Sequence, residues 1–223
     1  RSAWATLETL SLTFVYLTAP FDIRFAVFED HADDVARWNQ HVEDDLMARW
    51  PGLPIYLIGH SNGGFMSHRM ACDAGNILHT IINFAGATYG DFSDCSLTGY
   101  PNIVNVHGTN DGTIDYNGGQ IWGETYASSP DGAVYWADRS GCDSTSTQMG
   151  TMDLVGGDGN NETTQLQHLD CAQGNRVTHW KLSGVGHGPT FTDGSLINAA
   201  FNWAFNQPVD IEGCTDVNAT NYN

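Results

Sequence analysis

Short runs of apolar and β-branched residues recur along the 223-residue chain, separated by turn residues or by longer amphipathic stretches. Continuous apolar runs of this length are typical of strands that are buried on both faces of a parallel sheet. We expect such strands at residues 11–17, 54–58, 80–85 and 102–106. The longest apolar stretches fall well short of the roughly 20 residues that cross a bilayer, so we expect no membrane association.

Stretches with apolar residues three or four positions apart lie between these strands and predict helices. The clearest begins at Asp30, which can cap it, and runs to Trp50, where Pro51 closes it. Further helices are expected at residues 62–72, 118–128, 131–139 and 194–206. Strands that alternate with helices predict right-handed crossovers and a mostly parallel sheet of about five or six strands, with helices on both faces. The expected fold class is therefore α/β.

Two segments in the second half of the chain depart from this alternation. Residues 163–170 and 176–182 alternate polar and apolar positions around a turn, which predicts a hairpin. Residues 149–162 are rich in Gly, Asp and Asn, which is typical of an exposed loop. The length favours one folded domain, which we place at residues 1–208, followed by a linker or the start of a further module at residues 209–223.

Charge and cysteine content narrow the class of protein. The chain carries 26 acidic residues against 8 Lys and Arg, a formal net charge of −18, which repels phosphate backbones and excludes nucleic acid as a partner. The five cysteines lack C-x-x-C spacing, which favours disulfides over a zinc site and indicates an oxidising compartment. Together with the acidic surface, this predicts a secreted protein, which we expect to be a monomer.

The cysteines suggest two pairings. Cys72 with Cys95, and Cys142 with Cys171, would each close a local loop and stabilise the fold by about 3 kcal/mol. Cys214 is then left over.

The sequence directly after residues 54–58 reads Gly59-His60-Ser61-Asn62-Gly63-Gly64. In G-x-S-x-G, small residues flank a serine on a tight turn, where a strand and the following helix approach closely. The serine hydroxyl then points out of the turn into a cleft. The strand and the expected helix on either side favour this nucleophile elbow over an ordinary glycine-rich loop, which is the alternative interpretation.

A serine nucleophile needs a histidine base and a carboxylate that orients the histidine. In an α/β-hydrolase both follow the serine, the acid before the histidine, on loops after strand ends. Among nine histidines His187 fits best, because it lies in a glycine-rich loop before the last expected helix. Asp111 follows the strand at 102–106 by a short loop and is the expected acid, with Asp115 as its rival. The remaining histidines are expected to be structural, with His60 part of the elbow itself.

Acyl transfer also needs donors for the oxyanion, and the backbone N–H of Asn62 is expected to be one of them. The second normally comes from a loop after an earlier strand, and no such segment precedes Ser11, so we expect a fold that lacks its usual first strands. One missing donor costs about 3 kcal/mol of transition-state stabilisation. A non-catalytic or weakly active binding protein with an intact triad is therefore the alternative to an enzyme.

Three motifs together resemble the secreted polyhydroxybutyrate depolymerase and feruloyl-esterase-like branch of the α/β-hydrolases, close to carbohydrate esterase family 1. They are the elbow, the acid segment 107–116 and the histidine segment 184–187, within a resemblance over about residues 5–206. The resemblance implies a secreted serine esterase without cofactor or metal, whose partner is a polymeric, short-chain or feruloyl ester. It supports the pairing of Cys142 with Cys171. Family members carry a tryptophan shortly after the histidine, where this chain has Gly188-Pro189-Thr190-Phe191.

Aromatic and acidic residues near the expected site have two interpretations each. Tyr116, Trp122 and Phe191 form either an apolar substrate cleft or part of the aromatic core. Residues 153–162 and the Asp/Asn-rich tail are candidate calcium loops, but Gly, Asn and Asp build turns so readily that a solvated loop is the better interpretation. The tail at 212–223 resembles the start of Cys/Asp/Asn-rich repeats of secreted bacterial enzymes, which would hold the partner of Cys214.

Overall fold

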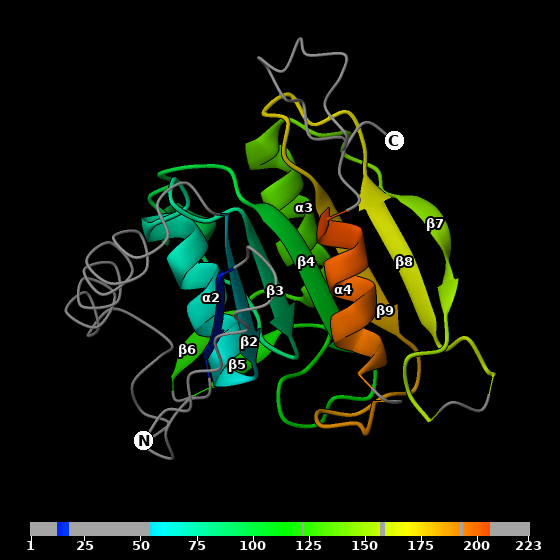
Figure 1. Ribbon diagram of the computed structural model, residues 1–223. Coiled ribbons are helices and arrows are strands. Elements are labelled where there is room, and N and C mark those ends of the chain that lie inside the picture. The colour runs from blue at the N-terminus through cyan, green and yellow to red at the C-terminus, as the bar shows by residue number, and fades with distance from the viewer. Residues whose placement is uncertain (1–12, 18–53, 122, 157–158, 192–193, 206–223) are drawn as a thin grey trace, which may run out of the picture.

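Seven strands form one sheet in the part of the chain that the computed structural model describes, which is residues 13–17, 54–121, 123–156, 159–191 and 194–205. Their order across the sheet is β1-β2-β3-β4-β9-β8-β7 (Figure 1). The strands are β1 (Thr13–Leu17), β2 (Ile55–His60), β3 (Thr80–Phe84), β4 (Asn102–Gly108), β7 (Thr147–Met152), β8 (Thr163–His168) and β9 (Val177–Leu182). The first four strands and β9 run parallel, and β8 and β7 continue the sheet antiparallel.

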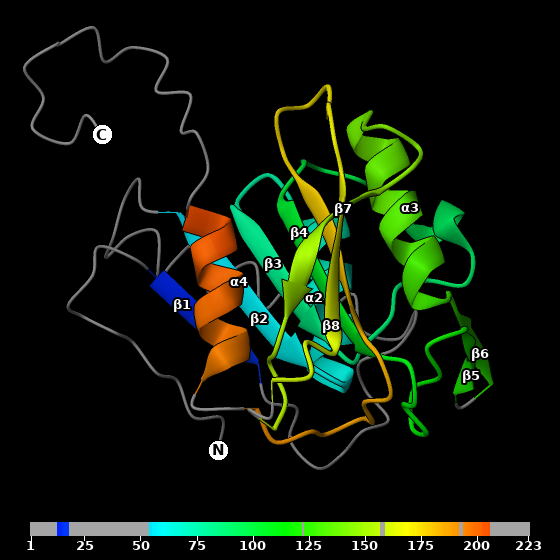
Figure 2. The same cartoon turned by 90° about the vertical axis from the view of Figure 1, so that its right-hand side faces the viewer.

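Helices cover both faces of this sheet. They are α2 (Asn62–Asp73), α3 (Ser129–Ser140) and α4 (Ser195–Phe205), with a short 3₁₀ helix, η3 (Phe92–Asp94). Figure 2 shows α4 on one face of the sheet and α3 on the other. Alternate residues of β2 follow this division, because Ile55 and Leu57 pack in a cluster with α2 and α3, whereas Tyr56 and Ile58 pack in a cluster with α4. Burial on both faces explains the continuous apolar run at residues 55–58 in β2.

The α/β class, the mostly parallel sheet and the β8–β9 hairpin are confirmed, as are the helices that became α2, α3 and α4. The helix expected at 118–128 is wrong, because this segment forms a hairpin of β5 (Gly119–Ile121) and β6 (Glu124–Tyr126). Gly118 and Gly123 have φ angles of 82° and 96°, which a right-handed helix excludes. The helix expected from Asp30 to Trp50 lies outside the described residues.

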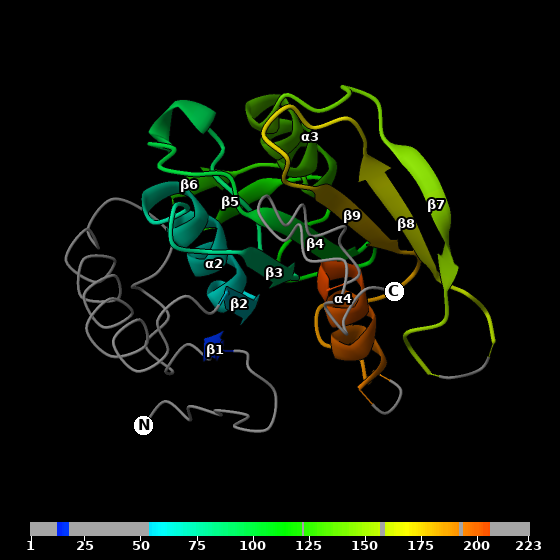
Figure 3. The same cartoon turned by 45° about the horizontal axis from the view of Figure 1, so that its top comes forward.

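The expected loop at 149–162 is wrong in its first part, where β7 runs to Met152. The strand is mostly exposed and polar, and its pairing with β8 at the end of the sheet supplies the backbone hydrogen bonds that hold it there. Its register shifts between Gln148 and Gly150, as in a β-bulge. β7 and β1 thus lie at opposite ends of the sheet (Figure 3).

Both expected disulfides are present. Cys72 in α2 is bonded to Cys95 after η3, and Cys142 after α3 is bonded to Cys171 in the β8–β9 connection. Cys214 and the domain boundary expected at residue 208 lie outside the described residues. No helix in the described ranges is both long enough and apolar enough to cross a bilayer.

The parallel strands place their carboxyl ends at one edge of the sheet. The loops that follow β4 and β9 therefore lie side by side at the lower end of the molecule in Figure 1. Backbone and side-chain hydrogen bonds join them, since the Asn110 N–H donates to the Val185 carbonyl at 3.0 Å and the Gly184 N–H to the Thr109 hydroxyl at 2.8 Å. This edge carries the candidate site.

Candidate active site

Ser61 forms the turn between β2 and α2 in a conformation that few residues adopt. Its φ is 55° and its ψ is −118°, and its N–H donates to the Phe84 carbonyl at 2.8 Å at the end of β3. Non-glycine residues with such angles are strained and persist only where the surroundings hold them. A tight strand-to-helix turn with a strained serine is the geometry of a nucleophile elbow, and with this sheet it makes the fold α/β-hydrolase-like.

The glycines around Ser61 are required by close packing. A Cβ atom on Gly59 would lie 1.9 Å from the Gly63 carbonyl oxygen, so strand and helix can meet only without a side chain there. A Cβ on Gly64 would lie 2.0 Å from the Asn83 side-chain oxygen, and one on Gly86 would lie 2.7 Å from the Ser61 carbonyl oxygen. The lack of a side chain at these three glycines therefore lets the elbow pack closely against the end of β3.

Two hydrogen bonds join Ser61, His187 and Asp111 in a row. His187 Nε2 lies 2.8 Å from Ser61 Oγ, and His187 Nδ1 lies 2.8 Å from Asp111 Oδ2. Asp111 stands on the loop after β4 and His187 on the loop after β9. The loops approach closely, because a Cβ on Gly108 would lie 2.2 Å from the Val185 carbonyl oxygen.

Asp111 is buried and holds a negative charge. Its Oδ1 accepts the N–H groups of Thr113 and Ile114, both at 2.9 Å. Burial raises the pKa of the Asp111 carboxyl, but the hydrogen bonds from His107, from His187 and from these two N–H groups outweigh it and hold the pKa well below its usual range. Since a carboxylate only accepts, Nδ1 of His187 carries the proton and Nε2 can accept the proton of Ser61.

His107 is a further partner of Asp111 that the sequence did not reveal. Its side chain is fully buried, and Nε2 lies 3.2 Å from Asp111 Oδ2 and 2.9 Å from the Ile114 carbonyl oxygen. Both neighbours are acceptors, so Nε2 carries the proton and donates to them. The sequence placed His107 only among the histidines expected to be structural, although its position in the acid segment 107–116 was a signal for this contact.

His60, the residue before the serine, contacts the loop that carries His187. Its Nε2 donates to the His187 carbonyl oxygen at 3.0 Å, and its ring stacks on Phe84 with centroids 4.9 Å apart. Burial lowers the pKa of His60, and the hydrogen bond to His187 only partly offsets this effect. The sequence placed His60 in the elbow, but a contact across 127 positions is not visible in a local motif.

Asn62 is the first residue of α2, so its backbone N–H has no acceptor within the helix and can face a developing oxyanion. The expectation that no segment before Ser11 supplies the second oxyanion donor concerns residues that lie outside the described part of the chain. The rival acid Asp115 is exposed, and its Oδ1 accepts the N–H of Asn117 rather than a histidine.

The three aromatic residues that were expected to flank the site differ in outcome. Tyr116 is buried, its hydroxyl lies 2.9 Å from His179 Nε2 and its ring contacts that of His107, so it belongs to the core. Phe191 is half-buried, and its ring meets the Phe84 ring edge-on at 5.0 Å, which places it next to the ring that supports His60. Trp122 lies outside the described residues.

Metal-ligating side chains do not gather in the described ranges, where no group of three or more His, Cys, Asp or Glu could hold an ion. In the candidate calcium loop, Glu162 Oε1 accepts the N–H groups of Leu154 and Val155, and Asp153 Oδ2 accepts the Gly159 N–H. These carboxylates shape the loop. The acidic tail lies outside the described residues.

No protein-family model matches the chain, and no curated protein matches it in sequence. Among solved structures, the chain is similar to an acetyl xylan esterase from Aspergillus awamori, with a TM-score of 0.48 and 14% identity over 78% of this chain. It is also similar to esterase PE8, with a TM-score of 0.43 and 18% identity over 71% of this chain. The matches cover 66% and 54% of those two proteins, so this chain spans less than two thirds of the length of each.

Proposed function

We propose that this protein hydrolyses carboxylic esters through an acyl-enzyme, with Ser61 as nucleophile, His187 as general base and acid, and Asp111 as the residue that orients His187. The observation that carries the proposal is the row of two 2.8 Å hydrogen bonds from Ser61 Oγ through His187 to a buried carboxylate. It is supported by the strained elbow at Ser61, which presents the hydroxyl at the edge of the sheet.

The proton positions define the steps. His187 Nε2 takes the proton of Ser61 as Oγ attacks the ester carbonyl, and Asp111 stabilises the resulting imidazolium. The Asn62 N–H donates to the oxyanion of the tetrahedral intermediate. His187 then gives the proton to the leaving alcohol, which departs and leaves an acyl group on Ser61. Water repeats the sequence, giving its proton to His187, and the carboxylic acid and free Ser61 result.

The substrate class follows from the motif resemblance. We propose polyhydroxyalkanoate-like polyesters, or short-chain and feruloyl esters, as the substrates of a secreted, monomeric enzyme that needs no cofactor. The Phe191 ring contacts Phe84, which in turn stacks on His60 beside the triad, and we propose that Phe191 contributes to the acyl or alcohol site.

Hydrolysis of p-nitrophenyl acetate and butyrate tests the chemistry. Wild-type protein is expected to turn over both esters, and Ser61→Ala is expected to reduce the rate to the background of spontaneous hydrolysis. Ser93→Ala is the matched control, because Ser93 is exposed in η3, away from the triad, and its loss should leave the rate unchanged. Equal rates for wild type and Ser61→Ala would sink the proposal and favour a non-catalytic binding protein.

A further inference from the structure

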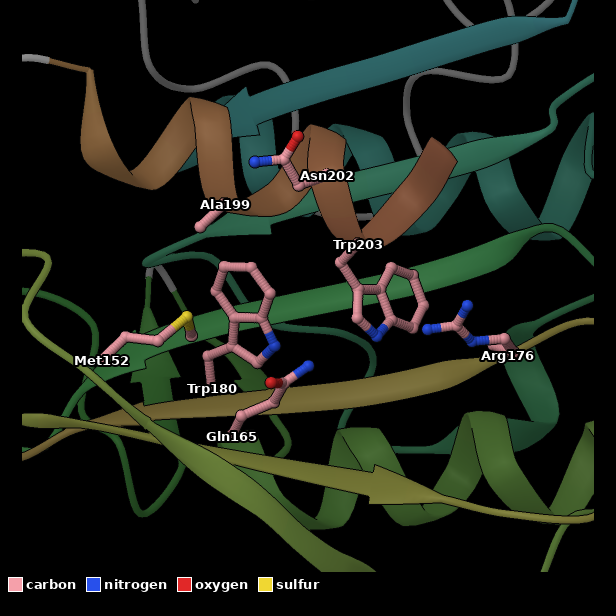
Figure 4. A pocket seen from close by; sticks show the side chains of 7 residues that line it. All are labelled: Met152, Gln165, Arg176, Trp180, Ala199, Asn202 and Trp203. Carbon is pink, nitrogen blue, oxygen red and sulfur yellow. The ribbon is translucent and has the colours of Figure 1, made fainter. Parts of the chain in front are cut away.

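A cavity of about 390 Å³ opens between α4 and the strands β7, β8 and β9. Figure 4 shows the side chains that line it, among them Met152 from β7, Trp180 from β9 and Trp203 from α4. Arg176, which directly precedes β9, lines it as well. The triad lies beyond the carboxyl end of β9, whereas the cavity lies alongside the strand and contains none of the three triad residues.

Arg176 is a half-buried cation that forms no ion pair with another described residue. No carboxylate in the described ranges lies within ion-pair distance of it, although the chain carries 26 acidic residues, and its Nε is buried without a hydrogen-bond partner. By contrast, Arg69 pairs with Asp73. Burial lowers the pKa of the Arg176 guanidinium, as expected for a cation that has lost part of its hydration.

Trp203 and the backbone hold the Arg176 side chain in position. The guanidinium carbon lies 4.1 Å from the centre of the Trp203 ring, a cation–π contact, and the Trp203 indole N–H donates to Gln167 at 3.1 Å. The Arg176 N–H donates to the Asn102 side chain at 2.8 Å, which anchors the main chain. The cation is therefore held in a defined position at the wall of the cavity.

The cavity is polarised along its length. In Figure 4, Met152 and Trp180 stand at one end and Arg176 at the other, with Trp203 between Trp180 and Arg176. The side-chain amide of Gln165 also lines the space. A ligand that fits this arrangement has an apolar body and one anionic end, and a volume of a few hundred Å³ is typical of small-molecule sites.

We propose that this cavity binds a small organic monocarboxylate, with the carboxylate on the Arg176 guanidinium and the apolar body against Trp180 and Met152. The planar guanidinium matches a carboxylate in bidentate fashion, which distinguishes this ligand from a neutral molecule of the same shape. The site is separate from the triad, and the inference does not depend on the proposed esterase activity.

Binding of 3-phenylpropionate to the full ¹⁵N-labelled chain tests the proposal, with the neutral amide 3-phenylpropanamide as the matched probe. We expect saturable shifts of the Trp203 indole N–H resonance, which Trp203→Phe identifies by its disappearance. The acid should bind about tenfold more tightly than the amide, because only the acid forms charge-assisted hydrogen bonds. No shift of this resonance, or equal affinity for acid and amide, would overturn the proposal.

A pair of arginine variants provides the second comparison. Arg176→Gln should weaken binding of the acid about tenfold and leave binding of the amide unchanged. Arg139→Gln is the control, because Arg139 also lies over an aromatic ring, 5.4 Å from the centre of Tyr135, but does not line the cavity. Equal losses in the two variants would contradict the assignment to Arg176. The acid–amide comparison on wild-type protein decides the proposal even where Arg176→Gln does not fold.

Discussion

The two oxygens of Asp111 have different partners, and this makes Asp111→Asn a directed test of the triad. Oδ1 accepts two backbone N–H groups at 2.9 Å, so the new side chain must keep its carbonyl oxygen at that position. Its NH₂ group then replaces Oδ2, which lies 2.8 Å from His187 Nδ1. The NH₂ donates to Nδ1, which forces the proton of the neutral imidazole onto Nε2. His187 is thereby held in the tautomer that cannot accept a proton from Ser61.

The expected loss of kcat is large because His187 in this tautomer can no longer act as a base. The equivalent substitution in a serine protease leaves the geometry intact and lowers kcat by about 10⁴-fold. At about 1.4 kcal/mol for each factor of ten, this corresponds to roughly 5 kcal/mol of transition-state stabilisation. We expect a loss of this order here, because the two N–H donors on Oδ1 outnumber the single His107 N–H that faces Oδ2 and therefore favour this orientation of the amide.

The assay is kcat for p-nitrophenyl butyrate, measured with thermal unfolding for wild type, Asp111→Asn and Asp115→Asn. Asp115 is exposed and its carboxylate accepts from Asn117, so its variant should keep kcat within about twofold of wild type, as is usual for surface substitutions. A folded Asp111→Asn protein that loses less than about tenfold would refute the reasoning, because a factor of ten is far below the cost of the wrong tautomer.

Two further predictions concern histidines outside the triad. His68 and His179 are buried, and burial lowers the pKa of each to about 3, so the unfolded chain binds more protons than the folded chain between about pH 6.5 and pH 3. As the pH is lowered through this window, the free energy of unfolding should therefore decrease by about 1.4 kcal/mol per pH unit for each histidine. Equal urea midpoints at about pH 7 and pH 5 would contradict this. His60→Phe keeps a ring against Phe84 but removes the donor to the His187 carbonyl, worth about 1 kcal/mol, so kcat should fall about fivefold at unchanged KM. His60→Gln, which restores a donor, should recover part of the loss, and full activity of His60→Phe would show that the contact does not position His187.

Burial on both faces made the central strands easy to predict. β2 shows this most clearly, because Ile55, Tyr56, Leu57 and Ile58 are all buried and their apolar run has one simple explanation. The elbow, and the rule that the acid and the histidine follow it on loops after strand ends, brought Ser61, Asp111 and His187 together as candidates, and their side chains lie within hydrogen-bond distance at one edge of the sheet. Their catalytic roles remain a prediction.

The errors arose where local sequence carries little information about the fold. β7 is polar and mostly exposed, so its sequence resembles that of a loop, and only pairing with β8 makes it a strand. The β5–β6 hairpin depends on positive φ angles at Gly118 and Gly123. The spacing of apolar residues, from which helices are predicted, carries no information about these angles. The contacts of His60 and His107 at the triad depend on the tertiary fold, which brings separate loops together.

The pairing of β4 with β9 also sets when in folding the site can form. Asp111 and His187 are 76 positions apart, and the chain between them includes the β5–β6 hairpin, α3 and the β7–β8 pair. Non-local parallel pairing closes a long loop and is intrinsically slow. Ester hydrolysis during refolding would therefore report on the completion of the sheet, and its recovery would lag behind the return of helical signal from α2 and α3, which are built from local contacts.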